Sequence, residues 1–123
     1  MQETDITDAI FAPAVLQSLA AAASADEFVR RKSTFADLRI GLQSESGARA
    51  VLIVQGCDVS IDPDAGAADF VFEGDDAAFG DLRSGLAFNR LVRQHRLHIT
   101  GDLRGCVQNW LLLYAIFRLI PEV

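Results

Sequence analysis

The sequence predicts an α+β domain, in which a five-stranded, largely antiparallel sheet is covered by helices on one face, in the order α(α)ββββαβα. Apolar residues that alternate with polar ones, or that run without interruption, mark four strands within residues 35–72 and a fifth at 97–100. Short segments rich in glycine, aspartate and proline separate these runs. Apolar residues at helical spacing mark the segments before, between and after the strands.

The N-terminal part is predicted to be helical. Pro13 suits the first turn of a helix, and the alanine-rich stretch that follows favours a helix over about 13–23. Ser24 and Glu27 have the spacing of a capping box, so we expect a second short helix over residues 26–32. One continuous helix is the alternative.

Four strands are predicted next. Residues 35–43 alternate between apolar and polar, which is typical of a strand with one covered face. Residues 50–54 form a continuous apolar run, which predicts a central strand with both faces covered. Residues 57–61 and 68–72 alternate again. Because the loops between these strands are short, we expect each strand to pair antiparallel with the next.

The second half of the chain is predicted to hold one more strand between two helices. Residues 74–76 end the fourth strand and cap a helix that stops near Gly85. Phe88 and Leu91 are placed in a connector, and residues 97–100 form the fifth strand.

A strongly apolar helix, capped by Asp102, is predicted to carry the chain to its end. Helical spacing selects one inward stripe, formed by Leu103, Val107, Trp110, Tyr114 and Phe117. Further apolar residues lie off that stripe, namely Leu112, Leu113, Ile116 and Leu119. A helix that is apolar nearly all round is buried on more than one side. We therefore expect a ligand, a partner chain or a membrane surface to cover its second side.

Composition limits the class of protein. The chain has 123 residues, enough for one domain over 1–123 with its own core, and residues 1–9 are expected to be flexible. The formal net charge of −6 argues against a general nucleic-acid binder. The only two cysteines do not make a disulfide framework or a structural zinc site. The acidic N-terminus and an apolar run of only 110–117 predict a cytoplasmic protein without a transmembrane segment.

The sequence shows no catalytic constellation, and we expect no metal and no cofactor. Motifs for phosphate binding and for a serine nucleophile are absent. His95 and His98 are three apart on a strand, which places them on opposite faces. Cys106 follows the start of the last helix, where the helix dipole could lower its pKa, but a buried structural cysteine explains it better.

Four segments in this order resemble the SCP-2-like (sterol carrier protein 2) lipid-transfer domain family over about residues 35–114. They are the strand pair 35–43 and 50–55, the Ala68–Phe72 strand, the Gly74–Gly85 helix with its D-x-x-x-F-x-x-L-x-x-G pattern, and the Leu97–Asp102 corner that resembles L-x-I-x-G-D/N. The resemblance implies a five-stranded sheet with helices on one side and an apolar tunnel between sheet and helices.

The apolar residues of the last three predicted elements could line that tunnel: Phe79, Leu82, Phe88, Leu97, Ile99, Val107, Trp110, Leu111 and Tyr114. Trp110 and Tyr114 could each donate a hydrogen bond to a ligand headgroup. Packing of the same residues against one another, as ordinary core, is the alternative explanation.

Three functions remain open at this point. The first is non-catalytic binding or carriage of an acyl, sterol-like or isoprenoid ligand in the tunnel between the sheet and the C-terminal helix. The second is a protein-interaction module, in which that helix packs against a second copy or a partner subunit. The third is a small enzyme with an apolar pocket. Transient membrane contact is compatible with the first.

Overall fold

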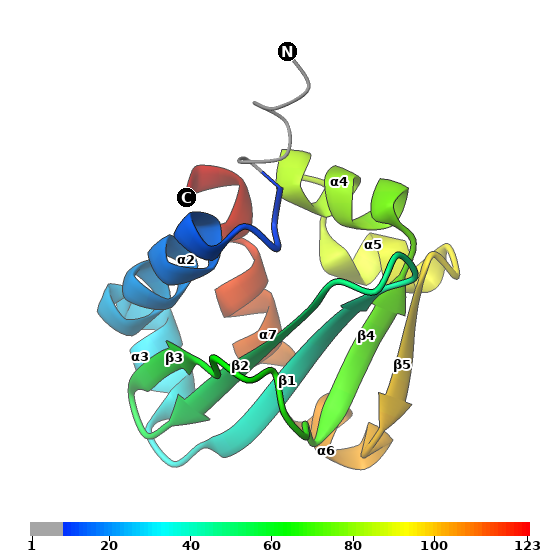
Figure 1. Ribbon diagram of the computed structural model, residues 1–123. Coiled ribbons are helices and arrows are strands. Elements are labelled where there is room, and N and C mark those ends of the chain that lie inside the picture. The colour runs from blue at the N-terminus through cyan, green and yellow to red at the C-terminus, as the bar shows by residue number, and fades with distance from the viewer. Residues whose placement is uncertain (1–8) are drawn as a thin grey trace.

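A five-stranded sheet organises the computed structural model, which describes residues 9–123 (Figure 1). Its strands are β1 (Asp37–Ser44), β2 (Arg49–Gln55), β3 (Asp58–Ile61), β4 (Phe70–Gly74) and β5 (Leu97–Gly101). They lie side by side in the order β3-β2-β1-β4-β5. The predicted α+β class is confirmed. The expected flexibility of the N-terminus concerns residues almost all of which lie outside the described part of the chain.

Strand pairing differs from the prediction at one place. The β1·β2, β2·β3 and β4·β5 pairs are antiparallel, but β4 pairs with β1 in parallel, Ile40 opposite Phe70, and does not pair with β3. The expectation that each strand would pair with the next is therefore wrong for β3 and β4. Residues 62–69 cross β2 and β1, so that β4 lies beside β1 on the side away from β2.

The crossing segment is fastened to the sheet by two arginines. Arg39 Nε donates to the carbonyl of Ala67 at 2.6 Å, and Arg49 donates to the carbonyls of Ala65 and Gly66 at 2.9 and 2.8 Å. The Arg39 guanidinium also pairs with the Asp62 carboxylate. This polar face of β1 and β2 is therefore covered by chain, whereas the helices gather on the other side of the sheet (Figure 1).

Two separate helices precede the sheet, α2 (Pro13–Ala25) and α3 (Glu27–Ser33). Asp26 between them has extended backbone angles, and its carboxylate accepts a 3.0 Å hydrogen bond from Val29 N. Asp26 is thus the cap of α3, and the capping role expected of Ser24 is wrong. Ser24 Oγ instead bonds both backbone groups of Val59 on the edge strand β3, at 3.0 and 2.9 Å.

The second half contains more helices than expected. α4 (Asp76–Ser84) ends at Gly85, as the sequence predicts. The expected connector is in fact a short helix, α5 (Phe88–Arg93). The expected single last helix is two, α6 (Leu103–Gln108) and α7 (Trp110–Phe117), followed by a 3₁₀ turn, η1 (Ile120–Glu122). The break lies at Asn109, whose φ of −106° and ψ of 19° are not helical.

The corner between β5 and α6 depends on Gly101. Its φ is +98°, and a Cβ added there would lie 2.7 Å from the Asp69 carbonyl oxygen. Only glycine accepts both this conformation and this approach. Asp102 then caps α6 by accepting from Gly105 N at 2.9 Å, so the predicted Gly-Asp corner sets the direction in which α6 leaves the sheet.

Aromatic rings fill the space between the sheet and the helices. Phe72 on β4 contacts Phe88 on α5 and Phe117 on α7, with ring centroids 5.9 and 5.4 Å apart. Phe88 and Phe117 contact each other at 4.9 Å. All three rings are almost fully buried. These edge-to-face contacts join the strand β4 to the helices α5 and α7.

Candidate functional site

Four of the residues proposed as tunnel lining lie in the core. Phe79, Leu82, Phe88 and Leu97 are each only 2% exposed and pack within the main hydrophobic cluster. Here they contact other core side chains directly, Phe79 touching Phe11 at 5.0 Å between ring centroids. Whether any of them contacts a ligand stays a prediction.

Two further lining residues lie at the margin of that core. Ile99 on β5 and Trp110 at the start of α7 are half-buried and pack against the cluster from its edge. The ring of Trp110 lies 4.9 Å from that of Phe88. Trp110 therefore connects the buried aromatic rings with the surface beside Asn109.

The remaining three lining residues point outward. Val107, Leu111 and Tyr114 are 69%, 58% and 44% exposed, and whether they contact a ligand stays a prediction. The expected inward stripe of the last helix is wrong for Leu103, Val107 and Tyr114, which are all exposed. The buried face of α7 is formed instead by Leu112, Leu113, Ala115, Ile116 and Phe117. Because α7 is apolar nearly all round, helical spacing alone did not show which side faces the sheet.

The exposed apolar side chains gather in two neighbouring parts of the chain. Among residues 9–123, the large apolar side chains that are exposed are five: Phe35, Leu103, Val107, Leu111 and Tyr114. We call these five the apolar band. Of the last four, Leu103 and Val107 lie on α6, and Leu111 and Tyr114 lie on α7, on either side of the non-helical residue Asn109. Phe35, between α3 and β1, is 97% exposed.

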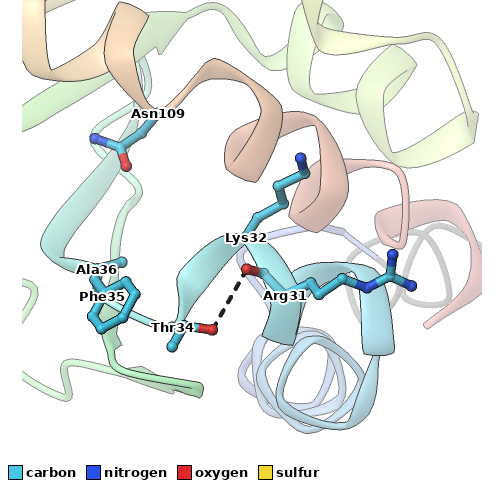
Figure 2. Close-up of a pocket in the computed structure, with 6 residues that line it drawn as sticks. All are labelled: Arg31, Lys32, Thr34, Phe35, Ala36 and Asn109. Atoms are coloured by element: carbon cyan, nitrogen blue, oxygen red, sulfur yellow. Dashed lines mark hydrogen bonds between the residues drawn. The ribbon is translucent and has the colours of Figure 1, made fainter.

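An open depression lies beside the break in the last helix. Its volume is about 310 Å³, and its walls are Arg31, Lys32, Thr34, Phe35, Ala36 and Asn109. Figure 2 shows Asn109 on one side and the residues that follow α3 on the other. The depression thus adjoins both the exposed ring of Phe35 and the residue that precedes Trp110.

Two of the residues that line this depression are cationic. Arg31 and Lys32 come from the last turn of α3, and both are exposed. Arg31 forms an ion pair with Glu27 at 3.4 Å, but both side chains are largely in solvent, so this pair is weak. Residues 103–118 contain two arginines and no acidic residue. Of these two arginines, Arg118 pairs with Asp26, and the exposed carboxylates of Asp37 and Asp102 directly follow Ala36 and precede Leu103.

Cys106 is a poor candidate for a reactive thiol. Its side chain is fully buried, and burial followed by the nearby Asp102 carboxylate raises the pKa of this thiol to about 11. A thiol with so high a pKa stays protonated at neutral pH and is a poor nucleophile. In the described part of the chain, no three His, Cys, Asp or Glu residues are grouped so that they could hold a metal ion.

Sequence reasoning missed one buried polar group. Asn89 Oδ1 on α5 is buried without a hydrogen-bond partner, the one side-chain oxygen or nitrogen in residues 9–123 in that condition. It directly follows Phe88, whose ring contacts Trp110. An unpaired buried acceptor costs free energy, so its presence calls for an explanation. Nothing in the local sequence pattern marks this asparagine.

Phe35, Arg31 and Lys32 were also missed as site residues. The alternation of apolar and polar residues over 35–43 assigned Phe35 to the first strand. In the structure β1 begins at Asp37, and the side chain of Phe35 is exposed before it. No pattern in the sequence assigned Arg31 and Lys32 to a site. Their shared position became visible only when the fold brought Asn109 next to them.

Comparison with known proteins places the fold. No family model matches the sequence, and no curated protein matches it. Among solved structures, sterol carrier protein 2 superposes with a TM-score of 0.79 at 17% identity, over 93% of this chain and 98% of that one. The protein TT1886 from Thermus thermophilus, described as possibly a sterol carrier protein, gives 0.72 at 16% identity, over 91% and 87%.

A third similar structure is the UbiJ-SCP2 ubiquinone synthesis protein, with a TM-score of 0.60 at 16% identity, over 93% of this chain and 97% of that one. The class is therefore an α+β domain with the SCP-2-like fold. The resemblance that the sequence motifs suggest is confirmed at the level of fold. At such low identities the likeness concerns architecture alone.

Proposed function

We propose that this chain binds and carries a hydrophobic ligand of the acyl, sterol-like or isoprenoid class without changing it chemically. The observation that carries the proposal is the open depression lined by Asn109. The next residue, half-buried Trp110, contacts the ring of Phe88 in the core. A headgroup would lie in the depression and the apolar tail beyond it. The name of sterol carrier protein 2, whose fold is shared, agrees with such a cargo.

Space for the tail must come from movement of the last two helices. The depression, at about 310 Å³, is at the lower end of the range for small-molecule sites. The aromatic rings behind it touch one another. We infer that α6 and α7 shift about the non-helical residue Asn109, opening a tunnel between the sheet and Trp110. A hinge of this kind needs only a few residues with altered backbone angles.

Non-catalytic carriage is preferred over an enzyme. A catalytic site needs a titratable group whose pKa is matched to its task. Cys106, on the buried side of α6, has a thiol pKa raised away from the useful range. Carriage needs no such group, because apolar contact and one or two polar anchors suffice for binding.

Fluorescence of Trp110 tests the proposal, because it is the single tryptophan of the chain. Cis-parinaric acid, a fluorescent fatty acid, would be titrated into the protein in vesicle-free buffer. We expect saturable quenching of Trp110 by energy transfer, at about one probe per chain. The Trp110→Phe variant is the control. It should show no energy transfer, but the fluorescence of directly excited probe should still increase on binding. Absence of saturable binding in both proteins would overturn the proposal.

The interaction-module alternative has one observation in its favour, which is the exposed apolar band. A second copy or a partner subunit could cover it. A ligand-free dimer in solution, with no uptake of cis-parinaric acid, would favour this alternative over carriage.

The cytoplasmic location stays a prediction. The structure, over residues 9–123, contains no helix with the length and apolar character needed to span a bilayer.

A further inference from the structure

We propose that the depression beside Asn109 selects a neutral hydroxyl headgroup, so that the carried ligand is a lipid alcohol. This assignment rests on the proposed carriage and adds the chemistry of the ligand's polar end. Two residues that line the depression from opposite sides supply the selection, Asn109 and Thr34 (Figure 2). Each offers a side-chain oxygen that accepts a hydrogen bond, so the ligand must bring the hydrogen.

The amide of Asn109 is oriented by α6. Its Nδ2 donates a 2.8 Å hydrogen bond to the carbonyl of Gly105, one turn earlier. Turning the amide over would place Oδ1 against that carbonyl oxygen, and two acceptors cannot bond to each other. Figure 2 shows Oδ1 on the side of the depression where Ala36 and Phe35 lie. Within residues 9–123, Oδ1 has no hydrogen-bond partner of its own, so it is left for a ligand.

The hydroxyl of Thr34 is oriented by α3 in the same way. Thr34 ends that helix, and its Oγ1 donates to the carbonyl of Arg30 at 3.0 Å, with the carbonyl of Arg31 at 3.5 Å (Figure 2). A threonine hydroxyl has one hydrogen and two lone pairs. Because the hydrogen is used on the last turn of α3, Oγ1 can offer a ligand only a lone pair.

The charges beside the depression do not select an ion. Arg31 and Lys32 line it, but Arg31 forms an ion pair with Glu27. Exposed Asp37 directly follows Ala36 of the wall. Positive and negative side chains are therefore balanced around the depression, and the uncharged acceptors decide what it recognises.

A hydroxyl is the headgroup that meets these groups without conflict. An ionised carboxylate only accepts hydrogen bonds, so it would face the acceptors of Asn109 and Thr34. A cationic amine would lie beside Arg31 and Lys32. A hydroxyl can donate to either acceptor, and its own oxygen can accept from Lys32. With the hydroxyl held by Asn109, the tail of the alcohol would begin beside the next residue, Trp110.

Three competitors with the same hydrocarbon chain test the selection: dodecanol, methyl dodecyl ether and dodecanoic acid. Each would displace cis-parinaric acid from the wild-type protein at neutral pH, without vesicles. The ether has the oxygen of the alcohol but cannot donate. We expect dodecanol to act at about tenfold lower concentration than either other compound, the effect of about one net hydrogen bond. An ether or an acid as potent as the alcohol would overturn the selection.

Paired variants locate the selection. Asn109→Leu and Thr34→Val each remove one acceptor, and each should lower the preference for alcohol over ether to about threefold. Gln108→Leu is the matched control, because it removes an exposed amide next to Asn109 that does not line the depression. It should keep the full preference. An equal loss in Gln108→Leu, or an unchanged preference in both other variants, would contradict the assignment.

Carriage and headgroup selection fail in different ways. If the chain alone is recognised, all three competitors displace the probe equally, which keeps carriage and rejects the selection. If cis-parinaric acid does not bind, carriage is overturned and the selection with it. Should Asn109→Leu disturb the helix break, circular dichroism would reveal it, and the exposed substitution Thr34→Val then decides the outcome.

Discussion

Arg118 at the end of α7 donates a 2.5 Å hydrogen bond to the carboxylate of Asp26, the residue that caps α3, across 92 positions of sequence. The same carboxylate oxygen accepts from Val29 N at 3.0 Å. One aspartate therefore both starts α3 and joins it to the last helix. The Arg118 guanidinium also lies over the ring of Phe28, 5.4 Å from its centroid.

Stability should depend on pH through Asp26. Its pKa lies below the ordinary value of 3.8, first because of the hydrogen bond from Val29 N and then because of Arg118. A carboxyl whose pKa is lower when folded contributes stability above its unfolded pKa and loses that contribution as pH falls through the folded pKa. The Asp26→Asn variant keeps a capping oxygen but lacks the charge. We expect it to be about 0.5 kcal/mol less stable than wild type at neutral pH.

Urea unfolding at about pH 7 and about pH 2.5 measures this difference. The gap between wild type and Asp26→Asn should narrow at the lower pH, because the stability that the ionised carboxylate contributes is lost as pH falls below the unfolded pKa towards the folded pKa. A gap of the same size at both values would show that the charge of Asp26 does not matter.

Leu111 and Leu113, two residues apart on α7, should respond differently to the same change. Leu113 is fully buried, whereas Leu111 is 58% exposed. Leu113→Ala should cost about 3 kcal/mol of unfolding free energy because it leaves a cavity, and Leu111→Ala should change stability by less than about 0.5 kcal/mol. Chemical denaturation of both variants checks the pair. A large loss for Leu111→Ala would mean that its side chain is covered in the native protein.

Asn89 should be a residue at which stability and binding are opposed. Replacing it with leucine removes the unpaired buried acceptor Oδ1, so Asn89→Leu should be about 1 kcal/mol more stable than wild type. If Oδ1 accepts a hydrogen bond from a ligand, the variant should also lose affinity for a lipid alcohol while keeping its affinity for the matching hydrocarbon. Thermal unfolding and competition with cis-parinaric acid measure the two effects. Lower stability of the variant would show that Asn89 has a structural role.

The two cysteines should differ sharply in reactivity. Cys57 is half-buried, while Cys106 is fully buried with a pKa of about 11. A thiol reagent at about pH 8 should modify one cysteine rapidly in the native protein and the second only after unfolding. In the Cys57→Ser variant, rapid modification of native Cys106 would contradict the burial of its side chain on α6.

Much of the fold could be predicted because its signals are local. Alternating apolar residues predicted the strand β1, and Gly85 predicted the end of the helix α4. Both signals involve only residues that are close in the sequence. The parallel β1·β4 pair could not be predicted in this way. It depends on the bonds that Arg39 and Arg49 make to a segment more than fifteen residues further along the chain.

The site was harder to predict than the fold. Helical spacing placed Val107 on the inward stripe and Leu113 off it, but in the structure Val107 is exposed and Leu113 is buried. The break at Asn109 has no glycine or proline to announce it. The depression needs this break together with Arg31 and Phe35, which are more than seventy residues away, so no local pattern could have revealed it.

Native mass spectrometry after incubation with a total lipid extract tests the central claim of carriage most directly. We predict a chain bearing one lipid, released by denaturing solvent and identified from its mass as acyl, sterol-like or isoprenoid. Weaker uptake by Asn89→Leu would tie that lipid to the region beside Trp110. A chain that stays free of lipid under the same conditions, whether as monomer or as dimer, would contradict the claim.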